Sequence, residues 1–175
     1  MNIALIGFRG TGKTTIARIL AKKLEMEFVD TDREIVNATG RSIPAIFDEA
    51  GEKIFRDVEK NIVKKVSQKD NQCIGCGGGV VLFKENVKNL RKNAVIVLLE
   101  SRPEKIYSRI NKDKNRPSLT DKDAMEEILH LLNERKPLYE SSADFKIETS
   151  DASLDECAES IIAKLKERGF FESKS

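Results

Sequence analysis

The residues with the clearest chemical signature lie near the N-terminus, where residues 7–14 read G-F-R-G-T-G-K-T. This is a complete Gly-x-x-x-x-Gly-Lys-Thr phosphate loop, whose backbone N–H groups and following helix bind phosphate oxygens. The Lys13 ammonium would reach the β- and γ-phosphates, and the Thr14 hydroxyl would lie on Mg²⁺. The alternative is a glycine-rich turn that binds nothing, but the motif has an apolar run before it and a helical pattern after it. We therefore expect a nucleoside triphosphate to bind at Gly7, Gly10, Thr11, Gly12, Lys13, Thr14 and Thr15.

Two carboxylates follow the second apolar run, in the sequence V-D-T-D of residues 29–32. Because ligands bind at the carboxyl ends of parallel strands, Asp30 and Asp32 are expected beside the phosphate loop. One carboxylate can hold water on Mg²⁺, and the other can accept a proton from an attacking hydroxyl. The alternative is an Asp that caps the helix expected at 33–39, a role that Asp32 fits on local sequence. Beside a phosphate loop we favour the catalytic interpretation.

Three consecutive glycines, Gly77, Gly78 and Gly79, follow Cys76 at the end of another expected strand. Glycine allows the backbone to approach a ligand closely, although a sharp turn before the next helix would also use it. This strand does not end in an aspartate. The carboxylate that often serves a metal site at this position is therefore absent, which makes Asp30 the stronger candidate for that role.

Arg56, Arg116 and Arg135 are spaced so that they could converge on one anionic ligand. The planar fork of arginine binds a carboxylate or phosphate through two hydrogen bonds. A surface role is usual for any single arginine, and the spacing does not show that the three meet. Arg116 lies in a polar segment, 112–122, that interrupts two helical patterns. This segment is either a solvated connection or a loop that closes over a transferred phosphate.

The chain has 175 residues and a formal net charge of +2. That length fits one domain with a buried core. The near balance of charge gives no overall basic field for nucleic acid. The sequence shows neither an apolar stretch near the ~20 residues of a membrane span nor a charged-then-apolar leader. We therefore expect a cytoplasmic monomer that binds neither nucleic acid nor a membrane.

The cysteines do not indicate a disulfide framework, since the chain has only three. Cys73 and Cys76 form a C-x-x-C, but they fall at the end of a strand, where positions three apart face opposite sides. A redox pair would lie at a helix N-terminus. A zinc site would need two more ligands, and Cys157 and His130 lie on separate helical patterns. We favour buried thiols over redox or metal function.

Short apolar runs alternate with helical periodicity along the whole chain. Strands are predicted at 2–7, 27–30, 72–76, 94–100 and 144–148. Helices are predicted at 13–25, 31–39, 43–49, 52–67, 84–92, 103–111, 123–140 and 154–168. This alternation predicts an α/β fold with a parallel sheet and helices on both faces. The run at 94–99 is apolar on both faces, as in a central parallel strand.

With these motifs in order, the chain resembles the shikimate kinases, small members of the nucleoside-monophosphate-kinase-like group of phosphate-loop folds. The phosphate loop is followed by D-T-D, T-G-R-S-I-x-x-I-F, G-E-x-x-F-R-x-x-E, G-G-G, an R-P pair and E-R-x-P-L-Y. A phosphate loop alone is shared by many activities, whereas G-E-x-x-F-R-x-x-E with G-G-G is far more specific. The resemblance covers almost the whole chain. It implies a three-layer sandwich with a five-stranded parallel sheet and a mobile lid.

The resemblance also implies roles for individual residues. Asp32 would bind the shikimate hydroxyls and act as the base, and Asp30 would organise Mg²⁺ waters with Thr14. Catalysis would rest on Asp32, Lys13 and Arg116, with Arg109 stacked on adenine. The shikimate site would consist of Asp32, Phe47, Phe55, Arg56, Glu59, Gly77, Gly78, Gly79 and Arg135. Within it, the two arginines 56 and 135 would hold the substrate carboxylate, and the segment 149–153 would border the base.

Two departures from the family pattern concern the lid and the adenine edge. Ser118 follows the R-P pair where the family usually has leucine, and Leu154 stands where it often has proline. Neither removes a catalytic or substrate-binding group. The resemblance thus implies one kinase domain at 1–175, with substrate-binding helices at 31–62, a lid at 112–122 and a flexible tail at 170–175. Its expected reaction is ATP-dependent, Mg²⁺-assisted phosphorylation of the shikimate 3-hydroxyl. A kinase for another acceptor such as gluconate, or an inactive nucleotide-binding relative, remains the alternative.

Overall fold

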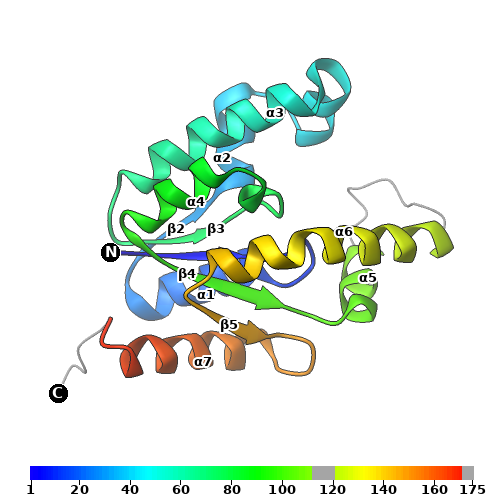
Figure 1. Cartoon of the computed structure of the whole chain (residues 1–175). Coiled ribbons are helices and arrows are strands. Elements are labelled where there is room, and N and C mark those ends of the chain that lie inside the picture. The colour runs from blue at the N-terminus through cyan, green and yellow to red at the C-terminus, as the bar shows by residue number, and fades with distance from the viewer. Residues whose placement is uncertain (112–120, 171–175) are drawn as a thin grey trace.

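The computed structural model describes residues 1–111 and 121–170, with side-chain positions for all of these except 121–123. In this part of the chain, five parallel strands form one sheet in the order β2-β3-β1-β4-β5 (Figure 1). The strands are β1 (Asn2–Ile6), β2 (Glu27–Asp30), β3 (Gln72–Gly75), β4 (Ala94–Glu100) and β5 (Phe145–Glu148). The predicted parallel sheet is therefore confirmed.

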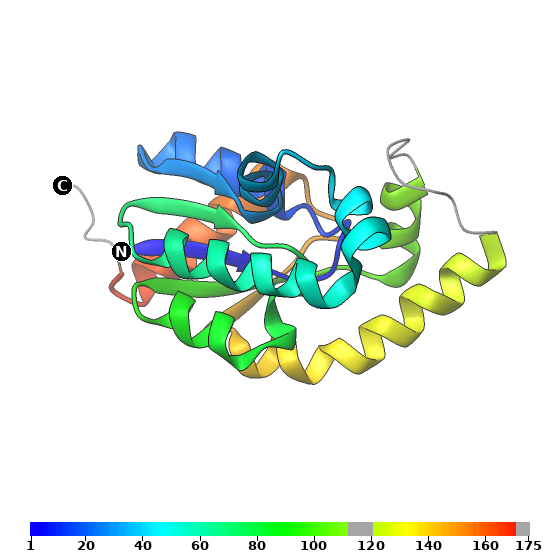
Figure 2. The ribbon, with the colours of Figure 1, turned by 90° about the horizontal axis from the view of Figure 1, so that it is seen from above.

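Helices cover both faces of the sheet and complete three layers. They are α1 (Lys13–Leu24), α2 (Thr31–Thr39), α3 (Ile43–Ser67), the 3₁₀ turn η1 (Val80–Leu82), α4 (Lys84–Arg91), α5 (Pro103–Asn111), α6 (Asp121–Ser142) and α7 (Leu154–Glu167). Seen from above, α3, α4 and α6 spread over one face, and α7 lies beneath the sheet (Figures 1 and 2). Among the described helices, none has the length and apolar character needed to cross a membrane.

The strand alternation divides the core into two halves. In β1, β3 and β4, even-numbered side chains such as Ile74 and Ile96 join the half that contains α3, α4 and α6. Odd-numbered ones such as Cys73 and Val95 join the half made with α1 and α7. The strand β4 is buried on both faces, since residues 95–99 are each at most 3% exposed. A central strand of a doubly covered sheet has this pattern, as the sequence predicted.

Two helices differ from the predicted ones by more than one residue at an end. Residues 43–67 form one helix with an interruption at Gly51, whose φ of 80° and ψ of 168° are not helical. The two predicted helices at 43–49 and 52–67 are thus the two arms of α3. The helix α6 extends beyond the predicted 123–140 at both ends and includes Pro137. Pro137 is tolerated there because it costs one backbone hydrogen bond in a long helix that packs on the core.

The carboxyl ends of the strands meet at one end of the sheet. In Figure 1 the arrows point toward the side where α5 and the first part of α3 lie. Every loop that carries a predicted site motif in the described residues leaves the sheet there. The fold therefore places the phosphate loop, the two aspartates and the three glycines at one edge, where ligands bind in open parallel sheets.

Candidate active site

The phosphate loop of residues 7–14 joins β1 to α1. Gly12 is the N-cap of α1 with φ 95°, and it has no side chain with which to cap the first-turn N–H groups. The uncapped amides and the positive end of the helix dipole leave an anion site at this terminus. Lys13 is buried, and its Nζ donates to the Phe8 carbonyl oxygen at 2.8 Å, which folds the side chain back over the loop. Thr14 and Thr15 are exposed at the mouth.

The phosphate loop is also stabilised by an internal hydrogen bond and by packing on β4 and α5. The Thr11 hydroxyl donates to the Phe8 carbonyl at 2.8 Å, and Thr11 is 1% exposed. A Cβ at Gly7 would run into the Leu99 carbonyl oxygen, and one at Gly10 would lie 3.2 Å from Ile110 on α5. These glycines therefore permit close packing of the loop on β4 and α5. Thr11 stabilises the loop with its side chain, so any nucleotide contact that it makes, as predicted, would come from its backbone.

Asp30 connects the second strand to the phosphate loop. Its Oδ2 accepts a hydrogen bond from the Thr14 hydroxyl at 2.7 Å. Its Oδ1 accepts from the Arg33 backbone N–H at 3.1 Å, which makes Asp30 the N-cap of α2. The alternative that Asp32 caps this helix is therefore wrong. The helix begins two residues earlier than that alternative requires, and Asp32 lies half-buried in its first turn.

Gly77 brings the catalytic aspartate candidate and a buried glutamate to one point. A Cβ at this glycine would lie 2.7 Å from Oδ1 of Asp32 and 3.2 Å from Oε2 of Glu59. The Gly77 N–H donates to the Thr31 hydroxyl at 2.9 Å and so fixes the loop to the start of α2. Asp32 and Glu59 thus both lie beside Gly77 of the glycine loop.

The other two glycines place the arginines. A Cβ at Gly79 would lie 2.6 Å from Cζ of Arg56, inside the guanidinium group. A Cβ at Gly78 would lie 3.9 Å from Nη1 of Arg135 and 3.4 Å from the backbone nitrogen of Arg9 in the phosphate loop. Residues from α3, α6 and the phosphate loop therefore meet at the three glycines. The sequence could not show this convergence, and the structure brings these two arginines together.

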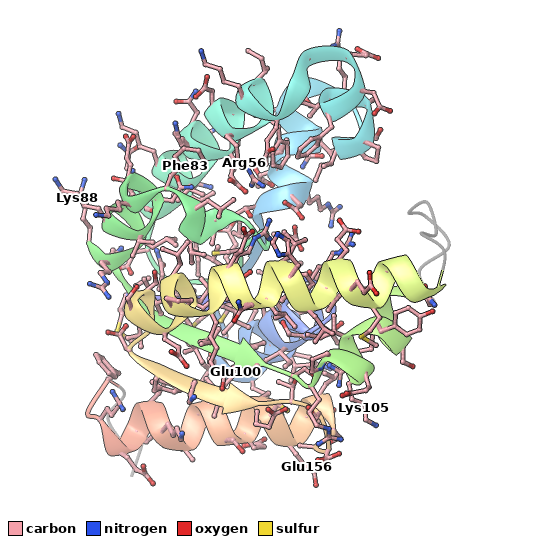
Figure 3. All side chains as sticks on the ribbon, turned by 45° about the vertical axis from the view of Figure 1, so that its right-hand side comes forward. Arg56, Phe83, Lys88, Glu100, Lys105 and Glu156 are labelled. Atoms are coloured by element: carbon pink, nitrogen blue, oxygen red, sulfur yellow. The ribbon has the colours of Figure 1, made fainter. Side chains whose placement is uncertain are left out.

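Arg56 lies on the inner side of α3 and is 8% exposed (Figure 3). Its Nη1 donates to Oε1 of Glu59 at 2.9 Å, and its Nε lies 3.4 Å from Oε1 of Glu52. Glu59 is 1% exposed. Burial raises its pKa, and the charge of Asp32 acts in the same direction, whereas the Arg56 guanidinium opposes both. A buried charged pair of this kind fixes the direction of the guanidinium.

Phe47 and Phe55 form an apolar wall beside the arginine. Their ring centroids are 4.6 Å apart with a tilt of 33° between the planes. The Phe55 ring is buried, and the Arg56 guanidinium carbon lies 5.0 Å from its centroid. The two rings lie on opposite sides of the interruption at Gly51, so the bend in α3 folds one against the other. They belong to the substrate-binding segment predicted at 31–62.

Tyr139 is a site residue to which sequence reasoning assigned no role. Its hydroxyl donates to the Gly78 carbonyl oxygen at 2.6 Å and accepts a hydrogen bond from the Arg135 side chain. Burial raises the pKa of this phenol, while the Arg135 charge opposes the shift. The signal was present in the sequence, because Arg135 and Tyr139 are four residues apart and share one helix face. The Arg135 guanidinium also lies 5.9 Å from the Phe8 ring centroid.

Arg109 lies on the other side of the phosphate loop, at the expected adenine edge. Its guanidinium donates to the Gly10 carbonyl at 3.0 Å and to the Thr149 carbonyl at 2.9 Å. The Thr149 hydroxyl donates to the Thr11 carbonyl at 3.1 Å. Leu154, at the start of α7, would contact a Cβ on Gly12 at 2.9 Å. Thr149 and Leu154 therefore contact the phosphate loop from this side, and the expectation that 149–153 borders the base stays a prediction.

Some predicted features fall outside the described residues or concern metals. Arg116 and Ser118 are not among the described residues, and neither is most of the predicted lid at 112–122; α6 already begins at Asp121. In the part of the chain that is described, no cluster of three or more His, Cys, Asp or Glu side chains could hold a metal ion. The assignment of Thr14 and Asp30 to a magnesium site therefore stays a prediction.

The three thiols do not belong to the site chemistry. Cys73 and Cys76 face opposite halves of the core, so they cannot act as a redox pair. All three cysteines are buried and free. Burial raises the pKa of Cys73 to about 12 and raises that of Cys76 further. The interpretation as buried thiols is confirmed.

A family model described as shikimate kinase matches residues 9–166. The chain belongs to the shikimate kinase family. A shikimate kinase of Pelotomaculum thermopropionicum is 45% identical over 98% of this chain and 99% of its own length. One from Caldanaerobacter subterraneus subsp. tengcongensis is 46% identical over 92% of this chain and 94% of its own length.

Solved structures of the shikimate kinase family show the same architecture. The enzyme of Acinetobacter baumannii in complex with shikimate matches with a TM-score of 0.90 and 34% identity, over 95% of this chain and 93% of that one. The Aquifex aeolicus enzyme matches with a TM-score of 0.85 and 33% identity, over 97% of this chain and 98% of that one. The expected nucleoside-monophosphate-kinase-like α/β fold is confirmed.

Proposed function

We propose that the protein transfers the γ-phosphoryl group of ATP to the 3-hydroxyl of shikimate, a step in the biosynthesis of chorismate and the aromatic amino acids. The observation that carries this proposal is the convergence at the three glycines. Asp32, Glu59, Arg56 and Arg135 all approach the glycine loop, and the phosphate loop touches the same backbone at Gly78. A hydroxylated carboxylate bound there would present a hydroxyl to the phosphate site. Family membership supplies the acceptor.

Two cations and an apolar wall suit a carboxylated ring. Arg56 and Arg135 approach the glycine loop from α3 and α6, and each has a guanidinium fork that matches a carboxylate. Phe47 and Phe55 supply an apolar surface for one face of the ring. The exposed backbone of the glycines allows the ring to lie close to the chain. These contacts would orient the acceptor, and orientation is a large part of phosphoryl-transfer catalysis.

In the transfer step, Asp32 accepts the proton of the attacking hydroxyl. Lys13, at the start of α1, stabilises negative charge on the β- and γ-phosphates, as does the N-terminus of this helix. Arg116 is assigned to the transferring phosphate on the resemblance alone. The predicted lid at 112–122 is assigned to the exclusion of water, which would otherwise hydrolyse ATP. Arg109 is assigned to the adenine ring, next to the Thr149 carbonyl that it already contacts.

The oxygen donors present fit a magnesium ion that arrives with ATP. Mg²⁺ takes few protein ligands and keeps waters and phosphate oxygens around it. The hydrogen-bonded pair of the Thr14 hydroxyl and the Asp30 carboxylate is a donor set of this kind. Thr14 would bind the ion directly and Asp30 through water. When bound, the ion neutralises charge on the phosphates.

The first experiment is a coupled ADP-release assay with ATP and Mg²⁺, in which shikimate is compared with gluconate, AMP and no acceptor. We expect shikimate-dependent turnover well above the rate without acceptor. ADP release with gluconate or AMP but not with shikimate would agree with the phosphoryl-transfer chemistry and would reject shikimate as the acceptor. ATP binding without stimulation by any acceptor would favour a nucleotide-binding relative that has lost the reaction.

Three further assignments belong to the same proposal. We assign residues 1–175 to one kinase domain, with substrate-binding helices at 31–62, a lid at 112–122 and a flexible tail at 170–175. We place the enzyme in the cytoplasm, where ATP and the pathway intermediates are found. We also assign it a monomeric state, which sedimentation equilibrium would test, since an active dimer would double the mass expected from 19.7 kDa.

A further inference from the structure

The Tyr139 hydroxyl joins the two halves of the acceptor site. One half is the glycine loop after β3, and the other is Arg135 on α6. The hydroxyl donates its proton to the Gly78 carbonyl at 2.6 Å and accepts a hydrogen bond from Arg135. It therefore uses its one proton on the loop and a lone pair on the arginine. A phenylalanine at this position would lose both contacts while keeping the ring.

The Tyr139 ring is packed in the core and also borders a cavity. Tyr139 is 3% exposed, but it also lines a cavity of about 410 Å³ between α6 and β4. Phe8, Ile106 and Leu132 are among the other residues that line this space. A ring that borders a cavity lacks close contacts on that side and can shift when its polar anchors are removed. The two hydrogen bonds therefore add to the packing and fix the direction of the hydroxyl end of the ring.

Gly78 lies where a shift would matter. Its Cα is close to both the Arg9 backbone and the Arg135 guanidinium, at 3.4 Å and 3.9 Å from an added Cβ. Displacement of the Gly78 carbonyl would therefore move the backbone between the phosphate loop and the arginine. Loss of the hydrogen bond to Arg135 would also free a long side chain that must be ordered to bind a carboxylate.

We propose that Tyr139 is a positioning residue for the acceptor carboxylate, which acts by fixing Arg135 against the Gly78 backbone. It touches neither reactant. This inference rests on the proposed function, since it concerns how tightly the acceptor binds. It predicts an effect on the acceptor and not on the nucleotide, because the described contacts of the Tyr139 hydroxyl lie on the acceptor side of the phosphate loop.

The test compares wild type with Tyr139→Phe, Arg135→Ala and the double variant, in steady-state kinetics with both substrates varied. A hydrogen bond to a charged group is worth roughly tenfold in binding, so Tyr139→Phe should raise the KM for shikimate by about that factor. The KM for ATP and kcat should stay within about twofold. In the Arg135→Ala background, the same substitution should change the shikimate KM much less, because its target is gone. Tyr107→Phe, which removes the other tyrosine hydroxyl of the chain, serves as the control.

The outcomes separate the inference from the function. No shikimate-dependent turnover in wild type would reject the proposed function itself. An active wild type with an unchanged shikimate KM in Tyr139→Phe would overturn the positioning role and leave the function standing. A parallel rise in both KM values, or an equal effect with and without Arg135, would show a general structural role and also overturn it. Thermal melting of each variant checks that the fold persists.

Discussion

At the scale of single residues, Asp32 and Asp30 show how neighbouring carboxylates take different roles. Asp30 has both oxygens engaged, by the Thr14 hydroxyl and the Arg33 amide. Asp32 instead faces Gly77, where the acceptor would lie. We expect Asp32→Asn to lower kcat by about 10²- to 10⁴-fold, the usual contribution of a general base, with little change in ATP affinity. Steady-state kinetics and nucleotide titration measure the two quantities, and a kcat near that of wild type would remove Asp32 from the role of base.

The two arginines of the acceptor site also differ at this scale. Arg56 is paired with Glu59 and Glu52, whereas the short contacts of Arg135 include the neutral Tyr139 hydroxyl and the Phe8 ring. We therefore expect Arg135 to give more of its charge to a carboxylate. Arg135→Ala should raise the shikimate KM by roughly 10- to 100-fold and leave the ATP KM nearly unchanged. Lys136→Ala, at the next and exposed position of α6, is the control; equal effects of the two variants would contradict a specific clamp.

At the scale of elements, the loop between β3 and η1 can lie close to its neighbours because its three glycines have no side chains. A Cβ at Gly79 would overlap the Arg56 guanidinium, whereas one at Gly78 would have no neighbour closer than 3.4 Å. Gly79→Ala should thus displace Arg56 from its buried position and raise the shikimate KM at least tenfold, and Gly78→Ala should do less. Kinetics of the two variants in parallel give the comparison. A larger effect at Gly78 would mean that the backbone, and not the arginine, is the sensitive part.

The helix α7 is fixed at its start by a capping box, in which the Ser153 side chain accepts from the Glu156 N–H and the Glu156 carboxylate accepts from the Ser153 N–H. Ser153→Ala should lower the free energy of unfolding by about 1 kcal/mol.

Hydrogen bonds from Ser153 lower the pKa of Glu156 in the folded state. The contribution of the Glu156 carboxylate to the free energy of unfolding is therefore present above the ordinary glutamate pKa of about 4.3, and it is lost as pH falls through the lower, folded value. Urea unfolding of wild type and Glu156→Gln should therefore differ at pH 7 and converge in acid. Ser160→Ala, on the same helix, should be nearly neutral, and a Glu156→Gln effect independent of pH would refute the assignment.

At the scale of the whole molecule, the sequence predicted all the strands that the described residues form, and it predicted that residues 94–99 are buried on both faces, because apolar runs between helical patterns report burial directly. It predicted the residues of the phosphate loop for the same local reason. It could not predict that Arg56 and Arg135 meet, since that depends on how α3 and α6 pack over the sheet. It missed the role of Tyr139, whose partners are a distant carbonyl and a side chain one turn away. It left the helix cap of α2 open between two aspartates, and the hydrogen bond from the Arg33 N–H to Asp30 decided it.

The two-sided core also gives a test of how the molecule unfolds. Cys73 and Cys76 lie on and after the inner strand β3, with 0% and 3% of their surface exposed, and Cys157 anchors α7 in the lower half at 1%. Burial also raises the pKa of Cys73 to about 12, so almost no reactive thiolate exists at pH 8 in the folded state. We expect no rapid reaction of any of the three thiols with a chromogenic disulfide reagent, and simultaneous reaction of all three in urea. If Cys157 reacted at a lower urea concentration than Cys73, the layer formed by α7 would open before the sheet does.

A saturating nucleotide should shift all three reactions to higher urea together, because α1 and its phosphate loop pack on both β3 and α7. Protection of Cys73 and Cys157 without Cys76 would show that nucleotide binding stabilises only the half of the core that contains α1 and α7.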